Sequence, residues 1–144
     1  RLFKNRTAMP SKNFSEFFAT MALTLESANL DFAKYYRGLF LEVGDSSSAK
    51  ILETVLADEI THVAFAVSWL KRWSAHQNLW DYYRNHLPSP GTPARAKGQV
   101  FNHEARRQAG LPEDFIKNLQ TYRDQYRITQ RKQWHEHTQN SSVR

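Results

Sequence analysis

The sequence of 144 residues predicts an all-α protein built around two long, antiparallel helices. Apolar residues recur at spacings of three and four over residues 13–43 and again over residues 47–74, which is the period of an amphipathic helix. Only a short turn containing Gly44 separates the two segments, and so short a connection places consecutive helices side by side and antiparallel. No segment shows the alternation of apolar and polar residues that is typical of strands.

The helix expected over residues 13–43 has both an apolar stripe and clear end signals. Pro10 and Ser11 precede it, and Gly44 is suited to end it, because glycine readily adopts the left-handed conformation that follows many helix C-termini. Asp45 and the three serines after it are candidate N-caps for the next helix. The apolar stripe consists of Phe14, Phe17, Phe18, Met21, Leu25, Phe32, Tyr36 and Leu39.

The second long helix, over residues 47–74, carries two ionisable residues within its apolar stripe. Glu59 and His62 both fall among the apolar positions. Taking one ion out of water costs on the order of several kcal/mol unless a partner compensates it. The position of Glu59 and His62 therefore predicts a compensating partner. The apolar members of the stripe are Leu52, Val55, Leu56, Val63, Ala66, Leu70 and Trp73.

The rest of the chain predicts shorter helices. Residues 79–87 favour a short aromatic helix, and the Pro/Gly-rich residues 88–96 favour a loop or linker without regular structure. Residues 97–110 predict one short helix closed by a glycine. Residues 112–136 predict a last helix with proline in its first turn.

The sequence thus divides into a helix pair over residues 1–87, a Pro/Gly loop over residues 88–96 and a basic helical extension over residues 97–144. The net charge of +6 is uneven, because residues 95–144 contain ten Lys or Arg against five Asp or Glu. A basic segment can bind nucleic acid or an acidic partner, although most such charges are only solvated helix faces.

Composition indicates a cytoplasmic protein. There is no cysteine, so neither disulfides nor thiolate metal sites are available. No apolar run approaches the roughly 20 residues that span a bilayer, and the N-terminal residues lack the apolar centre of a signal peptide. The chain begins at Arg1 rather than Met, which fits a piece of a longer protein as well as a processed chain.

Three residues of the two long helices predict a metal site. Glu59 and His62 are three residues apart, so one helix can present both to one ion. On the preceding helix Glu26 lies near Ala22 and Ala33, whose small side chains leave room for an ion. An inward Glu on one helix and an inward Glu-x-x-His on its antiparallel neighbour are half of the ligand set of a carboxylate-bridged di-metal bundle. Such ligands suit iron or manganese, and zinc is also compatible.

Each of these residues also has an ordinary interpretation. Glu59 alone would be a carboxylate at a helix edge, and His62 alone would be a hydrogen-bonded core histidine, but their combination with Glu26 favours the metal site. Asp58 is expected either to accept a hydrogen bond from a further metal-bound histidine outside this helix pair, and so orient it, or to be merely solvated.

Other residues with potential chemistry are assigned to the surface or the core. His103 and Glu104 could lie at the mouth of the site, although an exposed pair is favoured. The Trp and Tyr residues over 69–83 could form a radical pathway, although aromatic core is favoured. His135 and His137 are expected to be exposed to solvent and to bind metal only weakly.

Three segments together carry a resemblance to a known family: MALTLESANLDFAKYY, VGDSSSAKILETVLADEITHVAFAVSWLKRW and KGQVFNHEARRQAGL. On these segments the chain resembles the ferritin-like superfamily, and more closely the ferritin-like proteins of domain-of-unknown-function family 455 (DUF455). The resemblance implies a four-helix bundle in which two helix pairs each give Glu and Glu-x-x-His. This chain has one such set, Glu26, Glu59 and His62, which resembles that of the second pair.

The resemblance therefore implies that the chain is half of such a bundle with additional C-terminal helices. The missing pair would come from helices N-terminal to Arg1 or from a homodimer partner. The implied function is an oxygen-activating di-iron oxidoreductase such as a hydroxylase, acting on a small molecule or a tRNA-like substrate. The alternatives are a metal-storage or structural metal bundle, and a helical interaction module without enzymatic activity.

Overall fold

The computed structural model describes residues 11–124 of the chain. Within this range all regular secondary structure is helical, which confirms the predicted all-α class. In chain order the elements are α1 (Ser11–Thr20), η1 (Met21–Glu26, a π-helical turn), α2 (Ser27–Glu42), α3 (Ser46–Ser74), α4 (Leu79–His86), η2 (Pro93–Ala96, a 3-10 turn), α5 (His103–Gln108) and α6 (Glu113–Thr121).

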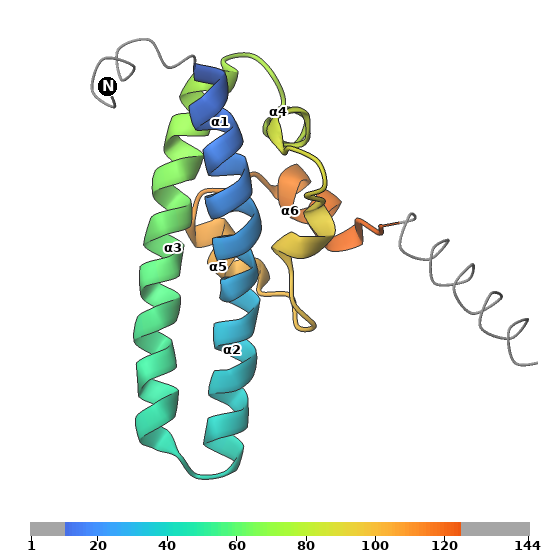
Figure 1. Ribbon diagram of the computed structural model, residues 1–144. Helices are drawn as coiled ribbons and strands as arrows, with labels where there is room; N and C mark the ends of the chain where they lie inside the picture. The colour runs from blue at the N-terminus through green and yellow to red at the C-terminus, as the bar shows by residue number, and fades with distance from the viewer. Residues whose placement is uncertain (1–10, 125–144) are drawn as a thin grey trace, which may run out of the picture.

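The two long helices predicted from apolar periodicity are confirmed and form a hairpin. α1, η1 and α2 continue one another as a single rod that runs antiparallel to α3 (Figure 1). Gly44 makes the turn at a positive φ of 79°, a conformation that glycine adopts without steric cost. Asp45 then caps α3 by accepting a hydrogen bond of 3.0 Å from the backbone N–H of Ser48.

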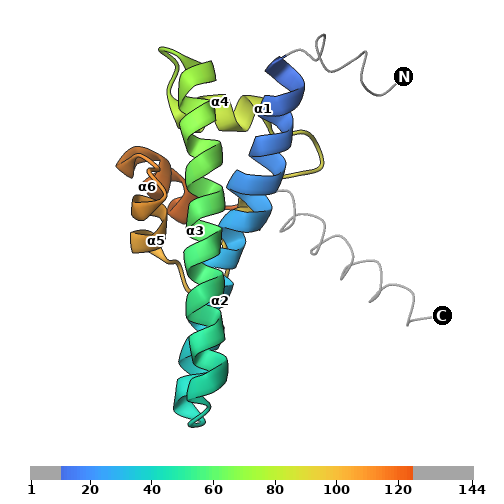
Figure 2. The ribbon, with the colours of Figure 1, turned by 90° about the vertical axis from the view of Figure 1, so that its left-hand side faces the viewer.

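The segments after α3 pack mainly against one side of this hairpin. Figure 2 shows α5 and α6 on one side of α3, and α5 also contacts α2. α4 contacts both α1 and α6, so it links the hairpin to the last helix. One continuous core joins the two parts, and its fully buried members include Leu23, Leu30, Val63 and Leu70 of the hairpin with Tyr83, Phe115, Ile116 and Leu119 of the later segments.

A buried ion pair joins the hairpin to the later segments. Asp31 of α2 and Arg106 of α5 are both fully buried, and the guanidinium meets the carboxylate through two hydrogen bonds of 2.6 and 2.9 Å. The same carboxylate also accepts hydrogen bonds from the backbone N–H groups of Gly98 and Asn102, at 2.8 and 2.6 Å. Arg106 donates further to the carbonyl oxygens of Asn102, Ser27 and Ala96. Nearly every polar atom of the pair is thereby satisfied, which buried charges require.

Two expectations for the later segments are corrected by these contacts. The helix predicted over residues 97–110 begins only at His103, because the Asp31 carboxylate takes up the N–H groups of Gly98 and Asn102 and keeps residues between them out of the helix. The segment 88–96, expected to lack regular structure, ends in the turn η2, whose Pro93 is buried.

The last helix is also shorter than predicted. The expectation was residues 112–136, whereas α6 ends at Thr121 and Tyr122 leaves the helical conformation with ψ of 135°. The ammonium group of Lys97 donates to the carbonyl oxygens of Leu119, Gln120 and Tyr122 at 2.7 to 2.8 Å, which satisfies the carbonyls that a helix end leaves free. The part of the predicted helix beyond residue 124 lies outside the described residues.

Replacing Arg106 by Met should destabilise the fold by about 3–5 kcal/mol, because it keeps the side-chain volume but leaves the Asp31 carboxylate buried without its cation. Urea unfolding measures this free energy. The matched control is Arg37→Met, which breaks the pair of Arg37 with Glu53 at 2.6 Å. Because that pair is exposed, its loss should cost less than about 1 kcal/mol. Equal losses in the two variants would contradict the role given to Arg106.

Tyr83 should make stability fall at alkaline pH. Burial raises the pKa of Tyr83 from 10.0 to about 12, so the folded protein holds this proton more tightly than the unfolded chain does. The resulting stability, about 2–3 kcal/mol, is fully present below pH 10 and is lost as the pH rises to about 12. Urea unfolding across this window should show the loss in the wild type and in the control Tyr35→Phe, which alters an exposed ring. Tyr83→Phe should lack it, and an unchanged pH dependence in that variant would refute the assignment.

Candidate metal centre

The three predicted metal ligands meet across the hairpin. Glu26 is the last residue of η1, and Glu59 and His62 lie one turn apart on the facing part of α3. One ligand atom from each of the three residues lies within 4.8 Å of the other two. The tight antiparallel turn at Gly44 sets this register, because it fixes which residues of the rod face which residues of α3.

The distances within the group are close to those that one ion requires. The Nδ1 atom of His62 is 3.9 Å from a carboxylate oxygen of Glu26 and 3.7 Å from one of Glu59. Two donors that each lie about 2.1 Å from an ion are at most about 4.2 Å apart. Small side-chain rotations would therefore bring all three donors to one ion.

Glu59 presents a buried oxygen to this group without a partner. Its Oε1 accepts a hydrogen bond of 3.2 Å from the side-chain amide of Asn29 on α2. Its Oε2 is buried and has no hydrogen-bond partner among residues 11–124. Because an unpaired buried carboxylate oxygen is costly, the observation favours a cation as its missing partner. The donor set of two carboxylates and one imidazole fits iron, manganese or zinc.

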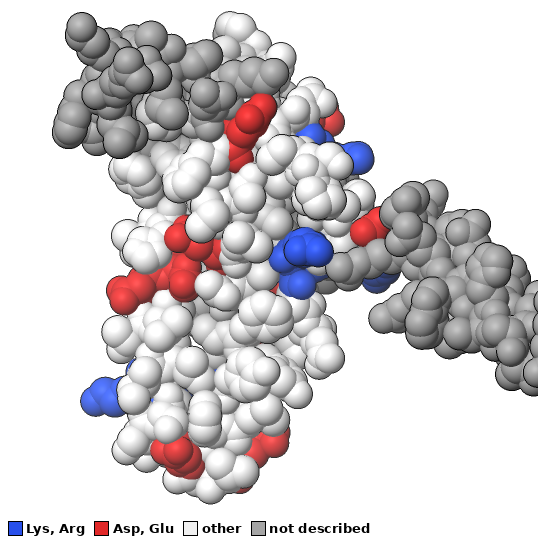
Figure 3. Space-filling model, in the orientation of Figure 1, with Lys and Arg blue, Asp and Glu red and all other residues white. Residues whose placement is uncertain are grey.

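The electrostatics of the group also favour a cation. Burial raises the pKa of Glu26, the negative charge of nearby Glu59 raises it further, and His62 partly opposes the rise. Figure 3 shows acidic side chains gathered midway along the hairpin. Two carboxylates held this close repel each other, and a bound cation would remove that repulsion.

The group lies at the edge of an open face. The sequence predicted that Glu59 and His62 point into a core, and within the described residues this holds for Glu59, whose side chain is 17% exposed, but not for His62, which is 58% exposed. The reason is that the later segments cover the opposite side of the hairpin. Large apolar side chains share the open face and belong to the predicted stripe, among them Phe14, Phe17, Met21, Leu25 and Val55.

The other residues singled out from the sequence lie elsewhere. Asp58 is exposed, and its side chain forms no hydrogen bond with any other residue of the range 11–124. Its orienting role therefore stays a prediction. His103 forms a surface pair with Glu113 at 3.0 Å, as favoured, and Glu104 contacts Arg107.

Three of the five aromatic residues singled out from the sequence are buried, and the two on α3 are half-buried. Trp80, Tyr82 and Tyr83 are buried among the later segments, whereas Trp69 and Trp73 pack against each other at 5.6 Å between ring centres. The interpretation as aromatic core is confirmed for Trp80, Tyr82 and Tyr83, whereas Trp73 stacks on Phe18, which lines a hollow together with Glu26 and His62. His135 and His137 lie outside the described residues.

Sequence reasoning missed three contributors to the site. Asp31 carried a usable signal, because it is a charged residue on the buried face of an amphipathic helix, five positions after Glu26. Asn29 gave no signal of its own, because its bond to Glu59 depends on the register of the hairpin. Thr24 gave no signal, because its partner Tyr83 is 59 residues away.

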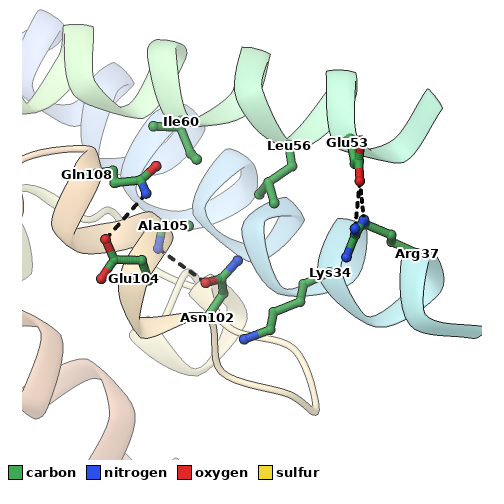
Figure 4. A pocket seen from close by; sticks show the side chains of 9 residues that line it. All are labelled: Lys34, Arg37, Glu53, Leu56, Ile60, Asn102, Glu104, Ala105 and Gln108. Carbon is green, nitrogen blue, oxygen red and sulfur yellow. Dashed lines mark hydrogen bonds and ion pairs between the residues drawn. The ribbon is translucent and has the colours of Figure 1, made fainter. Parts of the chain in front are cut away.

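Two hollows flank the hairpin on different sides. One of about 440 Å³ adjoins Glu26 and His62 and is otherwise lined mainly by apolar side chains, including Phe18, Phe65 and Met21. The other, of about 290 Å³, lies between the hairpin and α5. Figure 4 shows the second hollow, with Leu56 and Ile60 of α3 above it and a bond between Glu104 and Gln108 at its edge. Only the first hollow adjoins the candidate metal ligands.

Comparison with protein families gives one match. The family model described as "Protein of unknown function (DUF455)" matches residues 2–117, which is most of the chain. Comparisons with curated proteins and with solved structures give no match. Within residues 11–124 no helix is both long and apolar enough to cross a membrane. The resemblance found in the sequence is thereby confirmed: the chain belongs to the DUF455 family, which is generally considered ferritin-like.

Proposed function

We propose that this chain is part of a ferritin-like di-metal carboxylate protein that activates oxygen, with Glu26, Glu59 and His62 as metal ligands. The observation that carries the proposal is that three donor atoms, contributed by the two antiparallel arms of the hairpin, lie within 4.8 Å of one another. The buried Oε2 of Glu59 supports it, because this oxygen has no hydrogen-bond partner among residues 11–124 and a bound cation would supply one. Iron is the favoured metal, and when bound it would supply the oxidation chemistry.

The chain's own residues would then divide the work. Glu59 holds the metal from a nearly buried position, with Asn29 fixing its second oxygen. His62 would supply the imidazole ligand, and Glu26 would supply a second carboxylate from the facing helix. Once the open face is covered, the apolar hollow beside Glu26 and His62 would exclude water and seat a non-polar small molecule, which favours a small-molecule substrate over a tRNA-like one.

The proposal includes a partner for the open face. Three ligands from one side fill half of a di-metal site, and a soluble protein rarely leaves so many large apolar side chains in water. A second helix pair, from another segment of a longer chain or from a second copy, would cover the face and add the remaining ligands. Asp58 would then accept a hydrogen bond from a histidine of that pair.

Replacing His62 by Ala should strongly reduce metal binding while leaving the helix content unchanged. Anaerobic titration with Fe²⁺ and elemental analysis measure occupancy, and circular dichroism measures helicity. The matched control is His103→Ala, which removes a histidine that also lies near a carboxylate, that of Glu113 at 3.0 Å, but outside the group. Full occupancy in His62→Ala would show that this residue is no ligand.

The same samples separate oxygen activation from storage. On exposure to air, an oxygen-activating centre should develop near-ultraviolet absorption that a reductant bleaches repeatedly, because the metal cycles between oxidation states. Iron that oxidises once and accumulates beyond the two ions of one complete di-metal site would indicate storage. Binding without any redox change would indicate a structural metal.

The open face should make the isolated chain associate. Light scattering should give a mass above that of the 16.9 kDa monomer. Association would bury the exposed apolar side chains of the open face, such as Phe17, which has 57% of its surface exposed. Phe17→Glu should restore the monomer. Val43→Glu is the matched control, since Val43 is even more exposed, at 77%, but lies at the hairpin turn away from the group. A wild-type chain that stays monomeric would contradict the prediction that the open face binds a partner.

A further inference from the structure

The rod that carries Glu26 is not a uniform α-helix. Met21–Glu26 form a π-helical turn, and the N–H of Ser27 donates to the carbonyl of Ala22, five residues earlier. A π-turn holds one residue more than an α-turn, and it is uncommon because its geometry is unfavourable without support from the surroundings. Its presence within the ligand-bearing segment therefore calls for a stabilising contact.

A buried chain of hydroxyl groups provides that contact. The Thr24 hydroxyl donates to the carbonyl oxygen of Ala19 at 2.7 Å, again five residues earlier. The Tyr83 hydroxyl lies 2.8 Å from the same Thr24 oxygen. Because the one proton of Thr24 goes to a carbonyl, which can only accept, Tyr83 must be the donor in the second bond.

Neither bond can be replaced by water. Thr24 is 2% exposed, and Ala19 and Tyr83 are fully buried. Burial raises the pKa of Tyr83 to about 12, so its hydroxyl keeps its proton and remains a donor at neutral pH. Losing either partner would leave a polar group of this chain unsatisfied in the core.

The rod is held on both sides of the π-turn. On the N-terminal side, Ser15 of α1 bonds to the hydroxyl of Tyr82 at 2.7 Å. On the C-terminal side, Asp31 is held by Arg106. Closing the π-turn into an α-turn would rotate one side against the other by about 100°, the angle of one helical residue. Because contacts hold the rod on both sides of the π-turn, this rotation would have to distort the backbone between them, where Glu26 lies.

We propose that Thr24 and Tyr83 are positioning residues, whose hydrogen bond maintains the π-turn and thereby keeps Glu26 opposite Glu59 and His62. They do not touch the metal. This inference rests on the proposed function for its consequence, because the position of Glu26 matters to an ion only if Glu26 binds one. The segments after α3 thereby help to position Glu26, since Tyr83 belongs to α4 and packs against Phe115 of α6.

Co²⁺ binding to the full chain tests the inference, read by visible absorption that reports ligand number and geometry. Thr24→Val keeps the shape of the side chain but removes the hydroxyl, and Tyr83→Phe removes only the donor. Both should lower Co²⁺ affinity by about tenfold or more and alter the spectrum, as expected when a group that orients a ligand is lost. Thr24→Ser keeps the hydroxyl and should restore the wild-type affinity and spectrum.

The matched controls are Ser15→Ala and Tyr82→Phe. They break a buried hydroxyl pair that joins the same rod to α4, but Ser15 lies in α1, outside the π-turn that holds Thr24. They should lower thermal stability as much as the test variants do, yet leave Co²⁺ affinity and spectrum unchanged. Equal effects of the two pairs on affinity, or no effect of Thr24→Val, would overturn the inference.

A measurement without metal separates this inference from the proposed function. Nuclear Overhauser contacts between the side chains of Glu26 and His62 should be present in the metal-free wild type and in Ser15→Ala, and absent in Thr24→Val. If the wild type binds no Co²⁺, the proposed function fails, and these contacts alone decide the positioning role. Contacts that persist in Thr24→Val would refute that role whether or not metal binds.

Discussion

The buried pair of Asp31 and Arg106 determines which side of the hairpin is covered. Two charges of this kind are tolerated in a core only when almost every polar atom has a partner, and here the partners come from α2, α5 and the segment between η2 and α5. The observed arrangement of these segments satisfies nearly all of the pair's polar atoms. Because that arrangement places them on the side of Asp31, the side that carries Glu26, Glu59 and His62 stays open. The location of the candidate metal centre thus follows from an interaction on the opposite side of the same helix.

The two sides of the hairpin treat charge differently. Around Asp31 the protein supplies its own cation and donors, whereas around Glu59 residues 11–124 supply one amide and leave a buried oxygen without a hydrogen-bond partner. Glu26 adds a second carboxylate whose charge is disfavoured by burial and by Glu59. A fold selected only for stability would place apolar or neutral side chains there. Unfavourable local chemistry that persists in a folded structure is typical of a functional site.

The predictability of each feature from sequence depended on the range of the contacts that produce it. The hairpin, its turn at Gly44 and the N-cap at Asp45 follow from local periodicity and turn chemistry, and the structure confirms them. The meeting of Glu26 with Glu59 and His62 needed only the register of two adjacent helices. The start of α5, in contrast, is set by a carboxylate more than 60 residues away, and the end of α6 by Lys97. The π-turn depends on Tyr83, and no local pattern around Thr24 announces it.

Long-range contacts of this kind have an energetic consequence for the metal. If the bond between Thr24 and Tyr83 favours the arrangement of Glu26 that binds an ion, the ion must favour that bond by the same free energy, because coupling between two sites is reciprocal. Tyr83 is packed against Trp80 and Phe115, so the bond is part of the core that joins α4 and α6 to the hairpin. Metal binding would therefore strengthen the attachment of the later segments. The extension is then more than a cover for one side of the hairpin, since its stability and the occupancy of the site depend on the same turn of helix.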